Sequence, residues 1–119
     1  LAKDQQEKHR ESSGKEGIIL DFLEREIPSN WETLDLQKRR IFWNGNMRLE
    51  DGVELIPREK VCAAEIWVEC FGSELKYMKR SDSTEINNIL LCLKGWERIK
   101  TPRRFGTYGQ QRGFERVTT

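Results

Sequence analysis

The chain has 119 residues, and its 21 Lys and Arg against 20 Asp and Glu leave a net charge of +1. This length predicts one domain, or one domain with an ordered arm. No apolar run approaches 18 residues, so neither a membrane-spanning helix nor a signal peptide is predicted. The cysteines, an odd number, lie among apolar residues at Cys62, Cys70 and Cys92. We expect buried free thiols rather than a disulfide framework, which indicates a reducing, cytoplasmic compartment.

The near-neutral total hides an uneven distribution of charge. Residues 1–75 contain 11 basic and 16 acidic side chains, a net charge of −5, whereas residues 76–119 contain 10 and 4, a net charge of +6. A basic C-terminal third is typical of proteins that contact a polyanion such as DNA. The alternative is a chance scatter of charges in a charge-rich protein.

The first 14 residues are rich in Lys, Glu, Gln and Arg and offer almost nothing to bury. We interpret residues 1–14 as a linker or the tail of a preceding domain, and residues 15–119 as the folded domain. Because the chain begins with Leu inside this charged segment, we expect a piece of a longer protein. His9, the only histidine, has no partner ligand near it in sequence, so a metal or catalytic role is not predicted.

Apolar spacing predicts two helices in the first part of the domain. The first covers residues 15–26, with a stripe of Ile18, Ile19, Phe22 and Leu23, and Pro28 stops it. The second covers residues 35–43, where Asp35 is a good N-cap. Trp31 lies between them and is expected to anchor this linker on the core.

The middle of the chain predicts an extended segment followed by a helix. Residues 47–57 read as irregular or extended, and residues 58–61 as a short strand. A helix is predicted over residues 62–71. Gly72 ends it, because the residue that follows a helix often adopts a positive φ, which glycine does readily.

The next predicted helix covers residues 82–94, and we interpret it as the functional centre of the domain. Ser81, Asp82 and Ser83 are all suitable N-caps, and Gly95 follows the last turn. The buried stripe is Ile86, Ile89, Leu90 and Leu93. The opposite face shows Thr84, Asn87, Asn88 and Leu91, which suits contact with base edges or with another protein. Residues 76–80, just before it, carry three positive charges and Tyr77.

The C-terminal part predicts a basic antiparallel β-hairpin. Its strands are residues 96–101 and 110–117, and its loop, residues 102–109, is long enough to project. Arg103 and Arg104 lie on the loop. Arg98, Lys100 and Arg112 lie on the strands.

Helix, strand, helix, turn, helix and hairpin is the element order of a winged helix–turn–helix. We therefore expect a mainly helical α+β domain with a small antiparallel sheet and a hairpin wing, whose last helix enters a major groove of double-stranded DNA. The predicted DNA contacts come from the helix start, the helix face, the helix end and the hairpin: Ser83, Thr84, Asn87, Asn88, Lys94, Arg98, Lys100, Arg103, Arg104 and Arg112. The alternatives are a solvated helix face for the asparagines and a mobile, solubilising loop for Arg103 and Arg104. Tyr77 and Tyr108 could stack on a base or sugar, and the alternative for both is that of a partly buried loop aromatic.

Enzyme signatures are absent from the sequence. Residues 14–16, Gly-Lys-Glu, lack the upstream glycine and the Ser or Thr of a phosphate-binding loop. No Cys/His pair has zinc spacing, and the folded part offers no histidine to activate a nucleophile. No catalytic activity, cofactor or metal is therefore expected of this chain.

Several short motifs carry a family resemblance. They are Ile18-Ile19-Leu20-Asp21-Phe22-Leu23, Ile27-Pro28-Ser29-Asn30-Trp31, Arg39-Arg40, Val61-Cys62-Ala63-Ala64-Glu65-Ile66-Trp67-Val68-Glu69, Gly95-Trp96 and Arg112-Gly113-Phe114. Together they resemble the C-terminal region of the virulence-associated protein E family of phage- and island-encoded replication proteins.

The resemblance implies a segment that follows the P-loop ATPase core of a primase–helicase in a bacterial host. The ATPase motifs are not in this chain, so ATP hydrolysis does not carry over. In related replication initiators such a tail recognises origin DNA. A second hypothesis is a non-enzymatic interaction module, whose acidic N-terminal two-thirds docks on the ATPase core or on a host replication protein.

Overall fold

A computed structural model describes residues 13–117 as a small α+β domain. The expectations for residues 1–12, including the linker and His9, lie outside this range. The first helix already includes Ser13 and Gly14, so the folded part begins slightly before the predicted boundary at residue 15.

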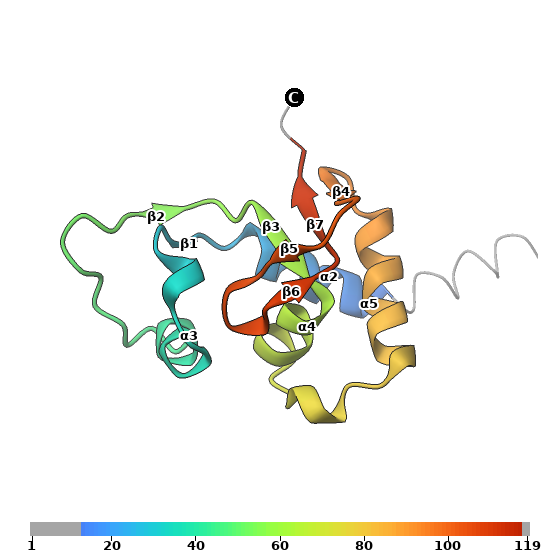
Figure 1. Ribbon diagram of the computed structural model, residues 1–119, viewed down its shortest axis with the longest axis horizontal. Helices are drawn as coiled ribbons and strands as arrows, with labels where there is room; N and C mark the ends of the chain where they lie inside the picture. The colour runs from blue at the N-terminus through green and yellow to red at the C-terminus, as the bar shows by residue number, and fades with distance from the viewer. Residues whose placement is uncertain (1–12, 118–119) are drawn as a thin grey trace, which may run out of the picture.

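Helices cover one face of a three-stranded antiparallel sheet (Figure 1). The helices are α2 (Ser13–Glu24), α4 (Ala63–Glu65) with its π-helical continuation η2 (Ile66–Cys70), and α5 (Arg80–Cys92). The strands are β3 (Lys60–Cys62), β4 (Trp96–Arg98) and β7 (Gly113–Arg116), in the spatial order β3-β7-β4. A short 3-10 turn, η3 (Leu75–Tyr77), precedes α5.

The two faces of this sheet have different neighbours, because side chains alternate along a strand. Val61 lies opposite Phe114, and both belong to the main core with α2, η2 and α5. Lys60 lies opposite Glu115 on the other face. Cys62 shares that outer face and packs with Ala64, Ile99 and Phe105 in a second, smaller cluster.

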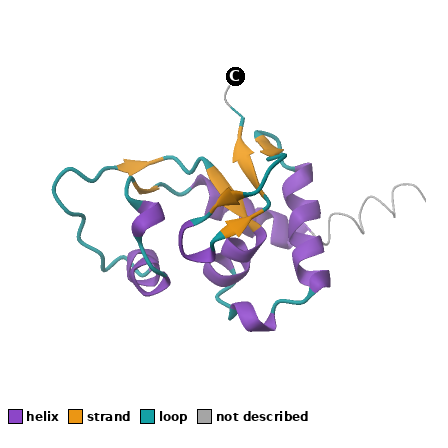
Figure 2. Ribbon diagram, in the orientation of Figure 1, coloured by secondary structure: helices purple, strands orange, loops and turns teal. Residues whose placement is uncertain are grey.

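The segment between α2 and β3 forms a separate lobe (Figure 2). It contains β1 (Ile27–Pro28), the 3-10 turn η1 (Trp31–Thr33), α3 (Leu36–Trp43) and β2 (Leu55–Ile56), and β1 pairs with β2 in antiparallel fashion. Its own apolar cluster centres on Ile27, Trp31 and Leu34. We call residues 27–56 the inserted segment.

The polypeptide between β4 and β7 forms a second short hairpin. Strands β5 (Arg103–Arg104) and β6 (Gln110–Gln111) pair across the turn η4 (Gly106–Tyr108). The predicted return strand over residues 110–117 is therefore broken into β6 and β7. The loop of the hairpin was predicted to project, and this is wrong. It is held in place because η4 packs against η1 of the inserted segment.

Most predicted elements are confirmed, with shifted ends and three wrong burial assignments, at Ile18, Cys92 and Cys70, the last of which is only half-buried. Asp35 caps α3 by accepting from the Lys38 backbone N–H at 2.9 Å. The strand predicted over residues 58–61 lies at 60–62. Ile18 was assigned to the buried stripe but is 52% exposed, and Cys92 is also exposed rather than buried.

Gly113 is required because Phe105 packs on the outer face of the sheet. A Cβ at this position would lie 2.4 Å from both the Phe105 ring and the Val61 carbonyl oxygen. We expect Gly113→Ala to lower the free energy of unfolding by about 1–3 kcal/mol through overpacking. Gly17→Ala is the matched control, since Gly17 lies within α2 with nothing within 4 Å. It should stabilise the protein by about 0.5–1 kcal/mol. Urea unfolding of both variants checks this, and equal effects would contradict it.

Candidate nucleic-acid interface

Helix α5 buries one face and presents the other to solvent, as its sequence predicts. Ile86, Leu90 and Leu93 are buried, and Ile89 is half-buried against the same cluster. Thr84, Asn88 and Leu91 are exposed, and Asn87 is half-buried at the edge of the free face. The free face of this helix therefore presents small polar side chains and Leu91, with Asn88 the most accessible amide. It also carries the exposed carboxylate of Glu85, which pairs with Lys15 at 2.7 Å.

The start of α5 differs from the prediction. The helix begins at Arg80, two residues before the predicted Asp82, and Asp82 instead accepts from the Lys79 backbone N–H at 2.9 Å. The backbone N–H of Ser83 donates to the Lys79 carbonyl oxygen at 3.1 Å. Ser83 and Thr84 therefore lie inside the helix, and their assignment to a free helix start that binds phosphate is wrong. The exposed residues at the true start are Arg80 and Ser81.

The basic side chains of the C-terminal third are nearly all exposed. Eight of them have no carboxylate of the described residues within 4.0 Å: Lys79, Arg80, Lys94, Arg98, Lys100, Arg103, Arg104 and Arg112. By contrast, Arg116 is half-buried and donates to the carbonyl oxygens of Leu23 and Arg58. The charges of these eight exposed cations are therefore not neutralised by acids of the described residues, whereas Arg116 is structural.

Sequence reasoning missed a buried ionic cluster beside the hairpin. It joins Arg39 of α3, Arg58 before β3, Glu65 of α4 and Glu69 of η2, whose side chains are at most 4% exposed. Glu65 Oε2 accepts from Arg58 Nη1 at 2.7 Å, from Arg39 Nη1 at 3.3 Å and from Trp31 Nε1 at 3.1 Å. One carboxylate oxygen therefore connects the inserted segment to the main domain.

Glu69 extends this cluster to the hairpin tip. Its carboxylate accepts from Arg39 Nη1 at 3.0 Å, from Trp43 Nε1 at 2.8 Å and from the Tyr108 hydroxyl at 2.7 Å. Tyr108 is consequently held and half-buried, which agrees with the expectation of a partly buried loop aromatic, while Tyr77 remains 64% exposed. Burial, followed by the charge of Glu69, raises the pKa of Tyr108.

One sequence signal could have revealed the cluster. Glu65 and Glu69 lie four residues apart, on one helix face, within an otherwise apolar run. The same spacing joins Arg39 to Trp43, and both reach Glu69. An acid in the apolar stripe of a helix requires a buried partner, so this pattern indicates a buried ion pair rather than a solvated helix face.

Burial and the nearby charge of Glu65 raise the pKa of the Glu69 carboxyl, and the hydrogen bonds from Trp43 and Tyr108 and the charge of Arg39 oppose this only in part. A carboxyl whose pKa is higher in the folded state stabilises the fold most below its unfolded pKa of about 4.3, and this contribution is lost as pH rises through the folded value. We expect the wild type to lose stability relative to Glu69→Gln as pH rises from about 4 to 8. Urea unfolding of both proteins across that range measures the difference, in which titrations outside the Glu65–Glu69 pair cancel. A constant difference would show that Glu69 titrates normally.

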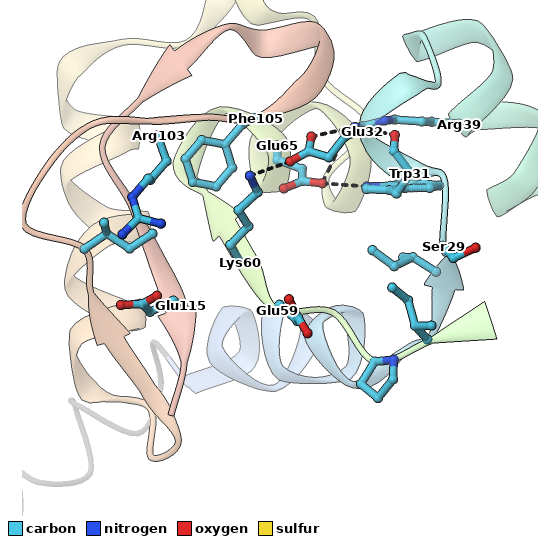
Figure 3. Close-up of a pocket in the computed structure, with 14 residues that line it drawn as sticks. Ser29, Trp31, Glu32, Arg39, Glu59, Lys60, Glu65, Arg103, Phe105 and Glu115 are labelled. Atoms are coloured by element: carbon cyan, nitrogen blue, oxygen red, sulfur yellow. Dashed lines mark hydrogen bonds and ion pairs between the residues drawn. The ribbon is translucent and has the colours of Figure 1, made fainter. Parts of the chain in front are cut away.

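A groove of about 390 Å³ separates the hairpin from the inserted segment (Figure 3). Arg103, Phe105 and Glu115 form one side, and Trp31 and Ser29 form the other. Lys60 and Glu59 lie between the two sides. Lys60 Nζ is paired with Glu32 at 2.5 Å and also donates to the Arg104 carbonyl oxygen at 2.6 Å.

Other kinds of site are not found in the part of the chain that the structure describes. Residues 13–117 contain no group of three His, Cys, Asp or Glu side chains that could hold a metal ion. No helix in this range is long and apolar enough to cross a membrane. Burial raises the pKa of Cys62 to about 12 and that of Cys70 to about 11, which makes both thiols poor nucleophiles.

No protein-family model matches the sequence, and no curated protein matches it.

Proposed function

We propose that this chain is a winged-helix domain that binds double-stranded DNA. The order α2, β3, α4, α5, β4, hairpin, β7 supports this, because a winged helix has one helix, one strand, two helices and two further strands. Its first strand pairs with its last, which pairs with the middle one, as in the order β3-β7-β4. The inserted segment is an addition between the first helix and the first strand.

The observation that carries the proposal is the set of eight exposed, unneutralised cations defined above. Phosphate contacts by Lys and Arg supply most non-specific DNA affinity, and a cation already paired with a carboxylate contributes little to them. Lys79 and Arg80 lie at the start of α5, and Arg103 and Arg104 lie on the hairpin. In this proposal α5 faces the major groove, Asn88 and Asn87 read base edges, and the flanking cations hold the backbone.

The resemblance to the virulence-associated protein E family extends this proposal to the parent protein. In that case the domain follows a helicase or primase core in the cytoplasm of a bacterial host and positions that core on DNA. The chain itself contributes binding rather than catalysis.

A protein-interaction module is the second candidate, and the inserted segment favours it. Ile41 and Leu55 are 41% and 46% exposed in this lobe, which also carries exposed acids such as Asp51 and Glu54. Such a surface could dock on the ATPase core or on a host replication protein.

Fluorescence anisotropy with a labelled random duplex, and with a single strand in parallel, tests the proposal. With about four to six phosphates contacted, log K should fall with log salt at a slope near −4 to −5. Duplex binding with this slope supports the DNA-binding function. No binding at low salt would overturn it and favour the interaction module, which a pull-down against the ATPase core would then test.

A further inference from the structure

The groove between the hairpin and the inserted segment has a mixed lining, of which the duplex-binding proposal uses only Arg103. Its volume of about 390 Å³ is within the range of small-ligand sites. Its apolar wall includes Ile56, Pro57 and Ile99 together with the rings of Trp31 and Phe105. Trp31, Ile99 and Phe105 are at most 5% exposed, so a flat, apolar group would lie mainly against Ile56 and Pro57.

The acidic side chains of the groove are of two kinds, those already paired with a cation and those that are not. Glu32 and Glu65 are already engaged, by Lys60 and by the buried arginines, respectively. Glu59 and Glu115 also line the groove, are exposed, and have no cation of the described residues within 4.0 Å. They offer free hydrogen-bond acceptors, whereas a phosphate placed beside them would be repelled.

Arg103 connects the groove to the proposed DNA surface. It lies on β5 next to Arg104, is exposed, and points into the groove in Figure 3. A phosphate held at this arginine would leave its base beside the apolar wall and the two free carboxylates. Amino groups on cytosine, adenine or guanine are the donors that such carboxylates accept from.

We propose that this groove receives one unpaired nucleotide of the bound DNA, with its phosphate at Arg103 and an amino-bearing base donating to Glu59 or Glu115. This inference rests on the proposed duplex binding, which it extends to DNA with an unpaired base. Thymine carries no amino group and is the disfavoured base. A basic peptide would satisfy the two carboxylates as well, but it would be repelled by Arg103 at the groove's edge.

The test compares three labelled duplexes that differ at one position: fully paired, with a single unpaired cytosine, and with a single unpaired thymine. The full chain should bind the cytosine probe about fivefold or more tightly than the paired duplex, and the thymine probe less tightly than the cytosine probe. In Glu59→Ala/Glu115→Ala, affinity for every probe rises because negative charge is removed, but the preference for unpaired cytosine is lost.

Glu97→Ala is the matched control. Glu97 is exposed on β4 directly opposite Glu115, on the same face of the sheet, and does not line the groove. This variant should keep the cytosine preference. Equal affinity of the wild type for the three probes would overturn the nucleotide site while duplex binding stands, and no binding to any probe would overturn both. NMR spectra give a second test of the nucleotide site. If a lysine-rich peptide, but not deoxycytidine monophosphate, shifts the Trp31 indole N–H signal, the groove is a protein-binding site and the nucleotide proposal is overturned.

Discussion

Replacing Glu65 with alanine should lower the free energy of unfolding by about 3–5 kcal/mol, because it leaves two buried guanidinium groups without their shared counter-charge. Arg39 and Arg58 are each 1% exposed, and both donate to Glu65 Oε2. Arg58 has no other ion-pair partner among the described residues, and its Nε and Nη2 have no hydrogen-bond partner there. A loss of this size is a large part of the 5–15 kcal/mol of a typical domain.

Urea unfolding followed by tryptophan fluorescence measures this effect. Glu74→Ala removes the same group from an exposed position, where Glu74 pairs with Lys76 at 3.3 Å, and should cost well under about 1 kcal/mol. Glu65→Gln keeps an acceptor oxygen but not the charge, so its cost should fall between the two. If Glu65→Ala cost no more than Glu74→Ala, the buried ionic cluster would not stabilise the fold.

Local pattern predicted most of the elements, because their signals are contained in a few neighbouring residues. The stripe of α5, the cap of α3 at Asp35 and the antiparallel pairing of β4 with β7 all follow from spacing and turn chemistry. The features that the local sequence pattern did not predict depend on contacts between distant segments. The pairing of β1 with β2 joins residues 27–28 to 55–56, across a region with no strand-like alternation.

In the candidate interface, too, local features could be predicted from the sequence and long-range contacts could not. Exposure of Arg103, Arg104 and Asn88 could be predicted, since polar residues in a loop or on a helix face need no distant partner. The position of the hairpin could not, because Tyr108 reaches Glu69 39 residues earlier in the chain. Gly106 allows this contact: it has a φ of +57°, and a Cβ there would lie 2.5 Å from Arg39 Nη2.

This packing has a consequence for the hairpin arginines. A hairpin held at its tip loses little conformational freedom when it contacts DNA, which favours binding. We expect Arg103→Ala/Arg104→Ala to weaken binding to all duplexes and to reduce the magnitude of the salt slope by about 1.8, the value for two phosphate contacts. The advantage of the wild type should therefore shrink about 12-fold between 50 mM and 200 mM salt.

Anisotropy titrations at both salt concentrations check this result. Arg40→Ala/Arg48→Ala is the matched control, because it removes two exposed arginines from the inserted segment and leaves the eight cations intact. Its salt slope should equal that of the wild type. If the hairpin variant also kept the wild-type slope, Arg103 and Arg104 would not contact phosphates. Binding would then depend on α5 and the cations at its start, Lys79 and Arg80, with the hairpin serving only to pack Tyr108 against Glu69.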